Sequence, residues 1–461
     1  MVLLDASPLL ASDIVAVGAC GKSGNALTLG ITHRLSPTFV IAAVLACVLT
    51  SMFLIGCRRQ QPRPLEPLVQ RGYLWQREWT PAVVDAVTQA EGKMEGLVIL
   101  GGEIQWHGAT PQTLRASIPW NALQTSKKPY AIALRVAPFG GPFASDDVPS
   151  QTITEVAQSL LTEARTHGVK VNEFQLDFDC AQKKLAGYQI WLKALRPAVS
   201  PMPLVITTLP AWLDEPEFVA LVGAVDGYVL QVHSVPTAKE SSRAALCDPA
   251  LARSWVAKAA RLGRPFAVAL PTYWCQAGYD PAGNLLGVAM DGVQPSWPGL
   301  TSVLELSADA DELAALVKEW QTLRPRGLKE LLWYRIPVAS DVRNWRWPTL
   351  AAVMAGRKPR HQIEVVTQGE NPVDFALTNT GEADDSLDVS VVVTWDDAGL
   401  VASDALPGWT VQEEAGRAVF MPGSAYRLRL TPGATQGVGW LRYDRSTIPL
   451  WQVTRNHHLS H

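Results

Sequence analysis

Eight short apolar segments recur between residues 71 and 358, and segments of helical periodicity separate them. The apolar segments, taken as strands, are 72–79, 96–105, 130–136, 173–179, 204–208, 227–233, 265–272 and 329–336. In one intervening segment, Ile153, Val156, Ala157 and Leu160 recur at the spacing of one helix face. This alternation predicts βα units with a parallel sheet, and eight units in about 290 residues predict a closed (β/α)8 TIM-type barrel.

An open, doubly wound sheet is the alternative fold for the same alternation. Such sheets bind nucleotides through a glycine-rich loop that follows a strand, but no GxGxxG or P-loop motif follows any of the eight segments. The barrel is therefore favoured over the open sheet, and no cofactor is predicted.

A second domain is predicted for residues 361–461, after a basic link at residues 357–360. Short alternating runs replace the βα pattern there, at 363–367, 373–378, 387–394, 409–412, 418–421, 426–430 and 437–443. Asn379-Thr380-Gly381 and a Pro-Gly pair supply turns between them. Seven short strands in about 100 residues predict a β-sandwich.

The first 57 residues predict a targeting segment. An apolar run at 39–55 is 17 residues long, which is short for a membrane-spanning helix of about 20 residues. It ends in Leu54-Ile55-Gly56-Cys57, which resembles the lipobox of bacterial lipoproteins. This predicts lipidation of Cys57, a polar, proline-rich spacer at 58–70, and domains held in the cell envelope outside the cytoplasm. An uncleaved membrane anchor is the alternative.

Charge and motif spacing exclude several classes of function. The chain has 40 basic and 43 acidic residues, and no basic run that would bind nucleic acid. It has no HExxH or CxxC motif, so no metal site is predicted. If the segment before Cys57 is removed and Cys57 is acylated, the cysteines that remain free to pair are Cys180, Cys247 and Cys275. Cys247 and Cys275 follow neighbouring strands, which predicts a disulfide between them, with two buried free thiols as the alternative.

Polar and aromatic side chains gather where the predicted strands end, at the barrel face that carries active sites. The residues chosen there as substrate-binding candidates are Trp75, Glu78, Trp106, Arg135, Gln231, His233, Tyr273, Trp274, Trp333, Tyr334 and Arg335. Carboxylates at several strand ends with aromatic rings between them suit glycoside hydrolysis, in which one acid protonates the leaving oxygen. The alternative is that these residues form an ordinary polar barrel rim.

The end of the fourth strand provides the candidate catalytic residues. Asp177 and Asp179 alternate with Leu176 and Phe178, so both acids point into the barrel and the apolar residues point to the helices. Two neighbouring carboxylates split their pKa values, which produces one acid and one base. A structural ion pair between Asp177 and Arg135 is the alternative. Glu103, at the end of the second strand, is the third candidate.

This motif resembles the strand-four DxDxE signature of chitinase-like glycoside hydrolases, whose last acid is the proton donor. With Asp177 and Asp179 on the first two acids, Ala181 stands at the donor position. Shifted by two residues, Gln175, Asp177 and Asp179 fill the three positions, and Asp179 becomes the donor. The resemblance therefore implies a catalytic acid at Asp179, with Glu103 as an alternative.

A longer stretch, from the YLWQREWTP sequence at residues 73–81 through LDFD at 176–179 to Tyr188 and Leu192, resembles a bacterial family known as domain of unknown function 3142. That resemblance implies a barrel in an envelope protein. The sequence thus predicts an envelope-anchored barrel protein that acts on a polysaccharide or oligosaccharide. A noncatalytic glycan-binding or assembly lipoprotein is the alternative.

Overall fold

A computed structural model describes residues 66–108, 110–235, 245–290, 296–423 and 429–455. These residues belong to one compact unit. The predicted lipobox, Cys57 and most of the predicted spacer lie outside the described residues. Within the described ranges, no helix combines the length and the apolar character needed to cross a membrane.

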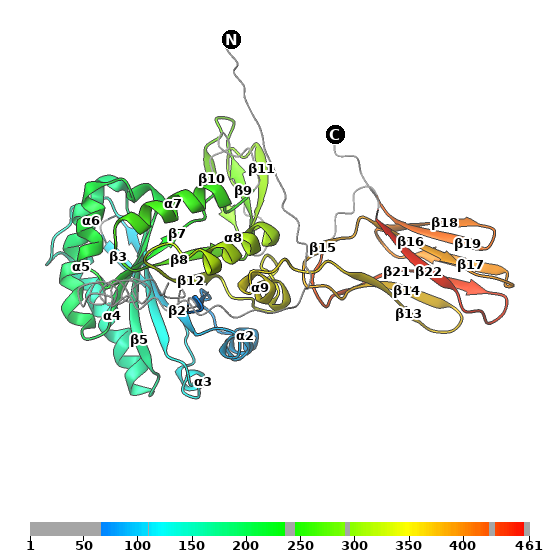
Figure 1. Ribbon diagram of the computed structural model, residues 1–461, viewed down its shortest axis with the longest axis horizontal. Helices are drawn as coiled ribbons and strands as arrows, with labels where there is room; N and C mark the ends of the chain where they lie inside the picture. The colour runs from blue at the N-terminus through cyan, green and yellow to red at the C-terminus, as the bar shows by residue number, and fades with distance from the viewer. Residues whose placement is uncertain (1–65, 109, 236–244, 291–295, 424–428, 456–461) are drawn as a thin grey trace, which may run out of the picture. The chain divides into compact units, whose positions relative to one another are not determined.

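Eight parallel strands close into a barrel, as predicted (Figure 1). They are β1 (Val69–Leu74), β2 (Gly96–His107), β4 (Tyr130–Val136), β5 (Val171–Phe178), β6 (Leu204–Thr208), β7 (Gly227–Gln231), β8 (Phe266–Pro271) and β12 (Leu328–Tyr334). Strand β1 pairs with both β2 and β12, which joins the two ends of the parallel sheet and closes it into a barrel. This closure rules out the open doubly wound sheet.

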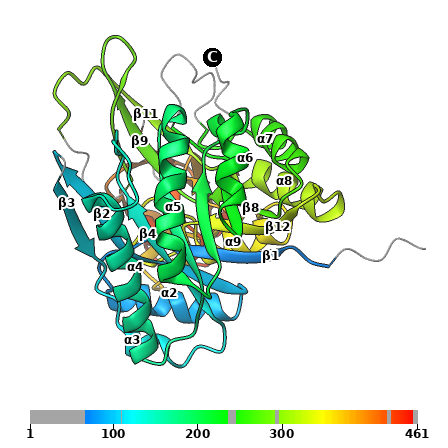
Figure 2. The ribbon, with the colours of Figure 1, turned by 90° about the vertical axis from the view of Figure 1, so that its left-hand side faces the viewer.

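Helices cover the outside of the barrel, and Figure 2 shows α4, α5 and α6 side by side over the strands. The helices are α2 (Pro81–Glu91), α3 (Trp120–Leu123), α4 (Val148–Thr166), α5 (Leu185–Val199), α6 (Pro216–Gly223), α7 (Pro249–Arg261), α8 (Ala310–Thr322) and α9 (Trp347–Met354). Helix α4 begins after Asp147, whose side chain accepts a hydrogen bond from the Ser150 N–H at 2.8 Å and so caps the helix. Its predicted apolar face, which includes Ile153 and Leu160, is buried against the strands.

The barrel interior holds small and branched residues in its middle, including Ala131, Ala133, Ala267 and Ala269. Polar residues lie below this layer, toward the amino ends of the strands. Arg71 pairs there with both Glu173, at 3.1 Å, and Glu330. Since each glutamate has a cationic partner, the cluster tolerates burial.

Two features of this half of the chain were not predicted: an extra strand beside β2 and a small separate sheet. The short strand β3 (Thr110–Arg115) pairs antiparallel with β2. A three-stranded antiparallel sheet, β9 (Trp274–Tyr279), β10 (Leu285–Ala289) and β11 (Ser302–Ser307), lies between β8 and α8 in the chain. Trp297 covers this sheet at Gly278 and Gly287, where an added Cβ would lie 2.3 and 2.4 Å from the indole.

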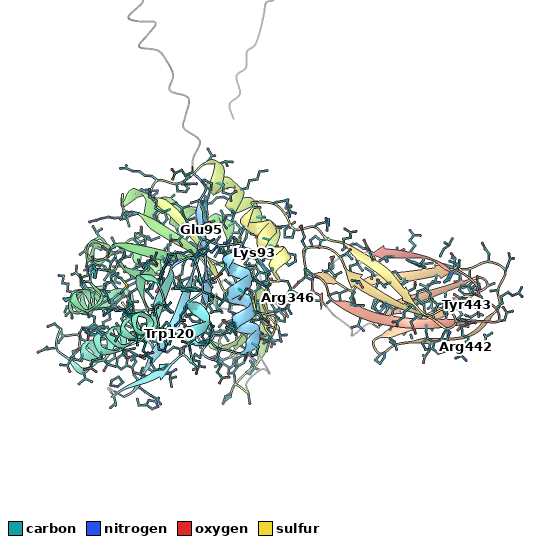
Figure 3. The ribbon with its side chains drawn as sticks, turned by 90° about the horizontal axis from the view of Figure 1, so that it is seen from below. Lys93, Glu95, Trp120, Arg346, Arg442 and Tyr443 are labelled. Atoms are coloured by element: carbon teal, nitrogen blue, oxygen red, sulfur yellow. The ribbon has the colours of Figure 1, made fainter. Side chains whose placement is uncertain are left out.

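The C-terminal residues form the predicted β-sandwich. One sheet has the order β13 (Ile363–Gln368), β14 (Val373–Asn379), β21 (Thr435–Tyr443), β17 (Leu400–Ala405), and the other has the order β18 (Trp409–Glu414), β19 (Arg417–Pro422), β16 (Val389–Thr394), β22 (Leu450–Arg455). A shared core includes Phe375, Val391, Phe420 and Tyr443, and Figure 3 labels Tyr443 in this domain.

Three strands of this domain were not predicted: β17, β22 and the short strand β15 (Asp385–Ser386), which pairs with β20 (Arg429–Leu430). The predicted strand at 426–430 lies partly outside the described residues.

Candidate functional site

Three charged side chains lie at one level of the barrel mouth, where the strands end. In the parallel register, Glu103 of β2 is opposite Arg135 of β4, and Arg135 is opposite Asp177 of β5. Parallel neighbours in register point to the same side of a sheet. Burial lowers the pKa of Arg135, whereas the negative charges of Asp177, Glu103 and Asp179 each favour its charged form and raise the pKa overall.

A β-bulge turns Glu103 into the mouth. The register of β2 shifts between Leu100 and Gly102, so two consecutive glycines, Gly101 and Gly102, interrupt the alternation of side chains. A Cβ added to Gly101 would lie 2.7 Å from Leu160 of α4, which shows that this position faces the helices. Strict alternation from there would turn Glu103 outward. The bulge reverses the alternation, and Glu103 points inward.

Asp177 is buried at the bottom of the mouth, with 9% of its surface exposed. Thr207 of β6 donates a hydrogen bond to Asp177 Oδ1 at 2.5 Å, and Arg135 Nε lies 4.0 Å from Asp177 Oδ2. Burial, followed by the charge of Asp179, raises the pKa of Asp177 to about 6, while Thr207 and Arg135 oppose this rise. The group therefore changes protonation near neutral pH.

Asp179 follows the end of β5, and solvent reaches its side chain. The surrounding walls of the mouth still raise its pKa through partial burial, against the charge of Arg135 and a hydrogen bond with Gln231 of β7. The two acids thus form one interacting pair, in which Asp177 is the buried member and Asp179 the accessible one.

Aromatic rings form one wall of the mouth. The ring of Trp75 contacts Tyr73 and Tyr334, with centroids 5.2 and 5.5 Å apart. Tyr334 also stacks on His233 at 5.7 Å and meets Tyr273 edge to face. Burial lowers the pKa of His233 to about 4, so the imidazole is neutral at pH 7. Its Nδ1–H donates to the Ala269 carbonyl at 3.3 Å, so Nε2 can accept a hydrogen bond without adding charge.

Two predicted stacking residues, Trp106 and Trp333, do not reach the mouth. The indole N–H of Trp106 donates to the Ala137 carbonyl at 2.9 Å, and its ring packs near Trp191 of α5. Trp333 is completely buried on the helix side of β12, whereas its neighbours Leu332 and Tyr334 face the barrel interior. Its indole N–H donates to Gln70 at 3.0 Å. The prediction was wrong for both because each occupies an outward position of its strand.

Three further candidates lie at or beyond the edge of the mouth. Glu78 is exposed in the segment between β1 and α2. Arg335 is buried and lies 3.4 Å from Asp341. The ring of Trp274 is contacted by the guanidinium groups of Arg343 and Arg429, at 5.0 and 5.4 Å, so it holds arginines rather than a free stacking surface.

The predicted disulfide is absent, since Cys247 and Cys275 are buried free thiols. They face different cores: Cys247 packs in the layer between strands and helices, whereas Cys275 packs in the small core of the β9–β11 sheet. Among the described residues, no cluster of three or more His, Cys, Asp or Glu side chains could hold a metal ion.

Thr207 and Tyr73 also belong to the site, although they were not predicted from the sequence. Thr207 is the last inward-facing residue of β6, so the alternation of residues 204–208 contained the signal. Tyr73 donates to Gln175 at 2.8 Å, and Gln175 donates to Glu173 at 2.6 Å. These bonds join the floor of the mouth to the charged cluster at the base of the barrel.

Comparison with solved structures finds distant similarity. Chitinase ChiA74 from Bacillus thuringiensis has 9% identity and a TM-score of 0.41, over 84% of this chain and 100% of that chain. The spore cortex-lytic enzyme SleL of Bacillus megaterium has 12% identity and a TM-score of 0.45, over 64% and 76% of the two chains. The GH18 chitinase ChiB of Flavobacterium johnsoniae has 11% identity and a TM-score of 0.38, over 59% and 89%.

No curated protein matches the chain. A family model matches a segment that includes six of the eight barrel strands, from β4 to β12, together with Asp177 and Asp179. The resemblance seen in the sequence is thereby confirmed: residues 124–339 match the family described as domain of unknown function DUF3142.

Proposed function

We propose that this protein hydrolyses glycosidic bonds at the barrel mouth, with Asp179 as the general acid and Asp177 as the group that sets its charge and position. The observation that carries the proposal is a pair of interacting carboxyl groups, both with raised pKa, in an aromatic-lined mouth. A general acid must hold a proton near the working pH and be accessible to the substrate. Asp179 combines a raised pKa with exposure to solvent.

Glu103 is the candidate for the second catalytic carboxylate. Asp177 and Asp179 come from one strand and so approach a substrate from one side, whereas Glu103 comes from β2, two strands away. At about 4.8 Å between neighbouring strands, the two backbones are about 10 Å apart. Carboxyl groups on separate strands of the mouth can act on opposite sides of a sugar bound between them, as glycoside hydrolysis requires.

The other mouth residues suit a sugar. Trp75 and Tyr334 supply ring surfaces of the kind on which sugar C–H groups pack. Gln231 and the neutral His233 supply polar groups that can bind hydroxyls without a net charge. We therefore propose an uncharged or weakly charged polysaccharide or oligosaccharide as the substrate.

The experiment is an assay of the full-length protein with soluble oligosaccharides of glucose, N-acetylglucosamine, glucosamine and galacturonic acid. We expect turnover of at least one, and NMR of the product shows whether the anomeric configuration is retained or inverted. Asp179→Asn should abolish turnover, and Asp177→Asn should reduce it less steeply. Thermal melts of both variants control for folding.

Two results would contradict the proposal. If Asp179→Asn lowers the melting temperature strongly while activity per folded molecule is unchanged, the pair is structural. If the protein binds an oligosaccharide but never cleaves it, the noncatalytic glycan-binding alternative replaces the enzyme.

The proposed location is the cell envelope, through an acyl group on Cys57 that holds the barrel beside the bilayer. This proposal depends on the lipobox sequence at residues 54–57. We expect Cys57→Ser to leave unacylated precursor containing residues 1–57. Mass spectrometry of the membrane fraction checks this, and an unmodified residue 57 in the wild-type protein would refute the anchor.

A further inference from the structure

Two neighbouring cavities lie beside the β9–β11 sheet, outside the barrel mouth. Their volumes are about 410 and 310 Å3, and Trp274, Asp384 and Arg429 line both of them. Such volumes lie at the lower end of the range for small-ligand sites. Arg346 and Ser340, from the segment after β12, complete the larger cavity, and Figure 3 labels Arg346.

Asp384 provides the first sign of a ligand. Its Oδ1 atom is buried and has no hydrogen-bond partner among the residues that the structure describes. A buried carboxylate oxygen is costly unless a donor meets it. Burial raises the pKa of Asp384, although the charges of Arg429 and Arg346 oppose the rise. A hydroxyl group in either cavity could supply the donor.

The charges around the larger cavity are balanced. Arg429 pairs with Glu305 at 2.9 Å, and Arg346 donates to the carbonyls of Val338 and Ala339. Asp341 also lines this cavity and lies 3.4 Å from Arg335. Together with Asp384 and Glu305, three carboxylates are thus set against three guanidinium groups, so the wall favours neither an anion nor a cation. Adjacent guanidinium and carboxylate groups instead suit vicinal hydroxyls, since each hydroxyl can accept from one and donate to the other.

Trp274 keeps this arrangement in place. Its ring lies under the guanidinium of Arg429 at 5.4 Å, which holds that cation at the border of both cavities. The residue before it, Tyr273, lines the smaller cavity, and its ring contacts Tyr334 and His233 of the barrel mouth. The side chain of Tyr273 therefore contacts the aromatic wall of the mouth and also lines the smaller cavity.

We propose that the cavities around Asp384 form a second saccharide-binding site, which holds a neutral sugar unit of a chain whose other units occupy the barrel mouth. The sugar donates a hydroxyl to Asp384 Oδ1 and accepts from Arg346 or Arg429. The identity of the glycan rests on the proposed function, but binding at this site does not require hydrolysis.

The test is calorimetric binding of hexasaccharides of glucose, N-acetylglucosamine, glucosamine and galacturonic acid to the full-length protein. Asp384→Asn removes the acceptor charge, and Ser340→Trp places a large ring at the larger cavity while leaving Asp384, Arg346 and Arg429 in place. We expect each to weaken binding of the preferred neutral hexasaccharide at least tenfold. Asp396→Asn, at an exposed position of the same domain, is the matched control and should bind as the wild type does.

Hydrolysis is measured separately with an aryl glycoside of one sugar unit, which is too short to span both sites. If it is cleaved, Asp384→Asn should leave that rate unchanged while raising KM for the hexasaccharide. Unchanged hexasaccharide binding in both Asp384→Asn and Ser340→Trp would overturn this inference and leave the mouth chemistry intact. Failure of the wild type to bind any of the four, or preference for a charged one, would also overturn it. Loss of binding without any hydrolysis would support the site and refute only the enzyme.

Discussion

Replacing Asp177 with Asn should make the protein more stable at alkaline pH. A folded-state pKa of about 6, against an ordinary value of 3.8, means that ionised Asp177 destabilises the folded state. At 1.36 kcal/mol for each pH unit, this corresponds to about 3 kcal/mol. The amide carries no charge and can still accept the hydrogen bond from Thr207. We therefore expect Asp177→Asn to raise the free energy of unfolding at pH 8 by about 1 to 3 kcal/mol.

The effect should depend on pH with a definite sign. Between about pH 4 and pH 6 the folded protein keeps the proton on Asp177, while the unfolded chain has lost it, so stability of the wild type falls as pH rises through this window. Above about pH 7 the destabilisation is complete. Below pH 4 both states are protonated, and the advantage of the Asn variant should vanish.

Thermal melts of the wild type and the variant at pH 8 and pH 4 measure this difference. We expect a rise of about 2 to 5 °C at pH 8 and no rise at pH 4. The exposed Asp396→Asn serves as the control at both pH values. A lower melting temperature at pH 8 would refute the reasoning, because it would mean that the contact with Arg135 outweighs the burial of the charge.

Three other changes test the fold around the site. Gly101→Ala places a methyl group against helix α4, so we expect urea unfolding to show a free energy of unfolding lower by about 1 to 3 kcal/mol. Any activity that needs Glu103 should fall as well, and an unchanged stability would mean that the bulge is not tightly packed. Arg71→Met leaves two buried glutamates without their cation and should cost about 3 kcal/mol or more, whereas a stabilised variant would contradict the ion-cluster argument. In denatured, unreduced protein, Cys247 and Cys275 should both react with iodoacetamide, and protection of the pair would restore the disulfide.

The strands of the barrel were predictable from local pattern. The segments 130–136 and 204–208 coincide with β4 and β6, because strands buried on both faces form continuous apolar runs bounded by polar turns. The same alternation correctly turned Asp177 into the barrel, since the side-chain direction in a regular strand depends only on residue parity. Asp179 follows the last residue of that strand. The sequence thus determined the fold class and the central acid pair.

The direction of a side chain could not be predicted from alternation where a strand is irregular, or where the inward positions of the strand were not identified. Glu103 reaches the mouth only through the bulge at Gly101 and Gly102, and a bulge depends on how a strand fits its neighbours and the covering helix. Trp106 and Trp333 carry the residue type of a sugar platform, but they lie on the outward face and serve the core. Residue type alone does not distinguish these roles.

Contacts between segments distant in the chain were decided by the tertiary structure alone. The thiols of Cys247 and Cys275 belong to different cores, although their positions after neighbouring strands suggested a pair. The pKa of Asp177 on β5 is the balance of burial, which raises it, and of Thr207 on β6 and Arg135 on β4, which lower it. Local pattern determines which residues form a strand and which face they take. The free energy of a charge depends instead on everything packed around it, and only the folded chain brings those groups together.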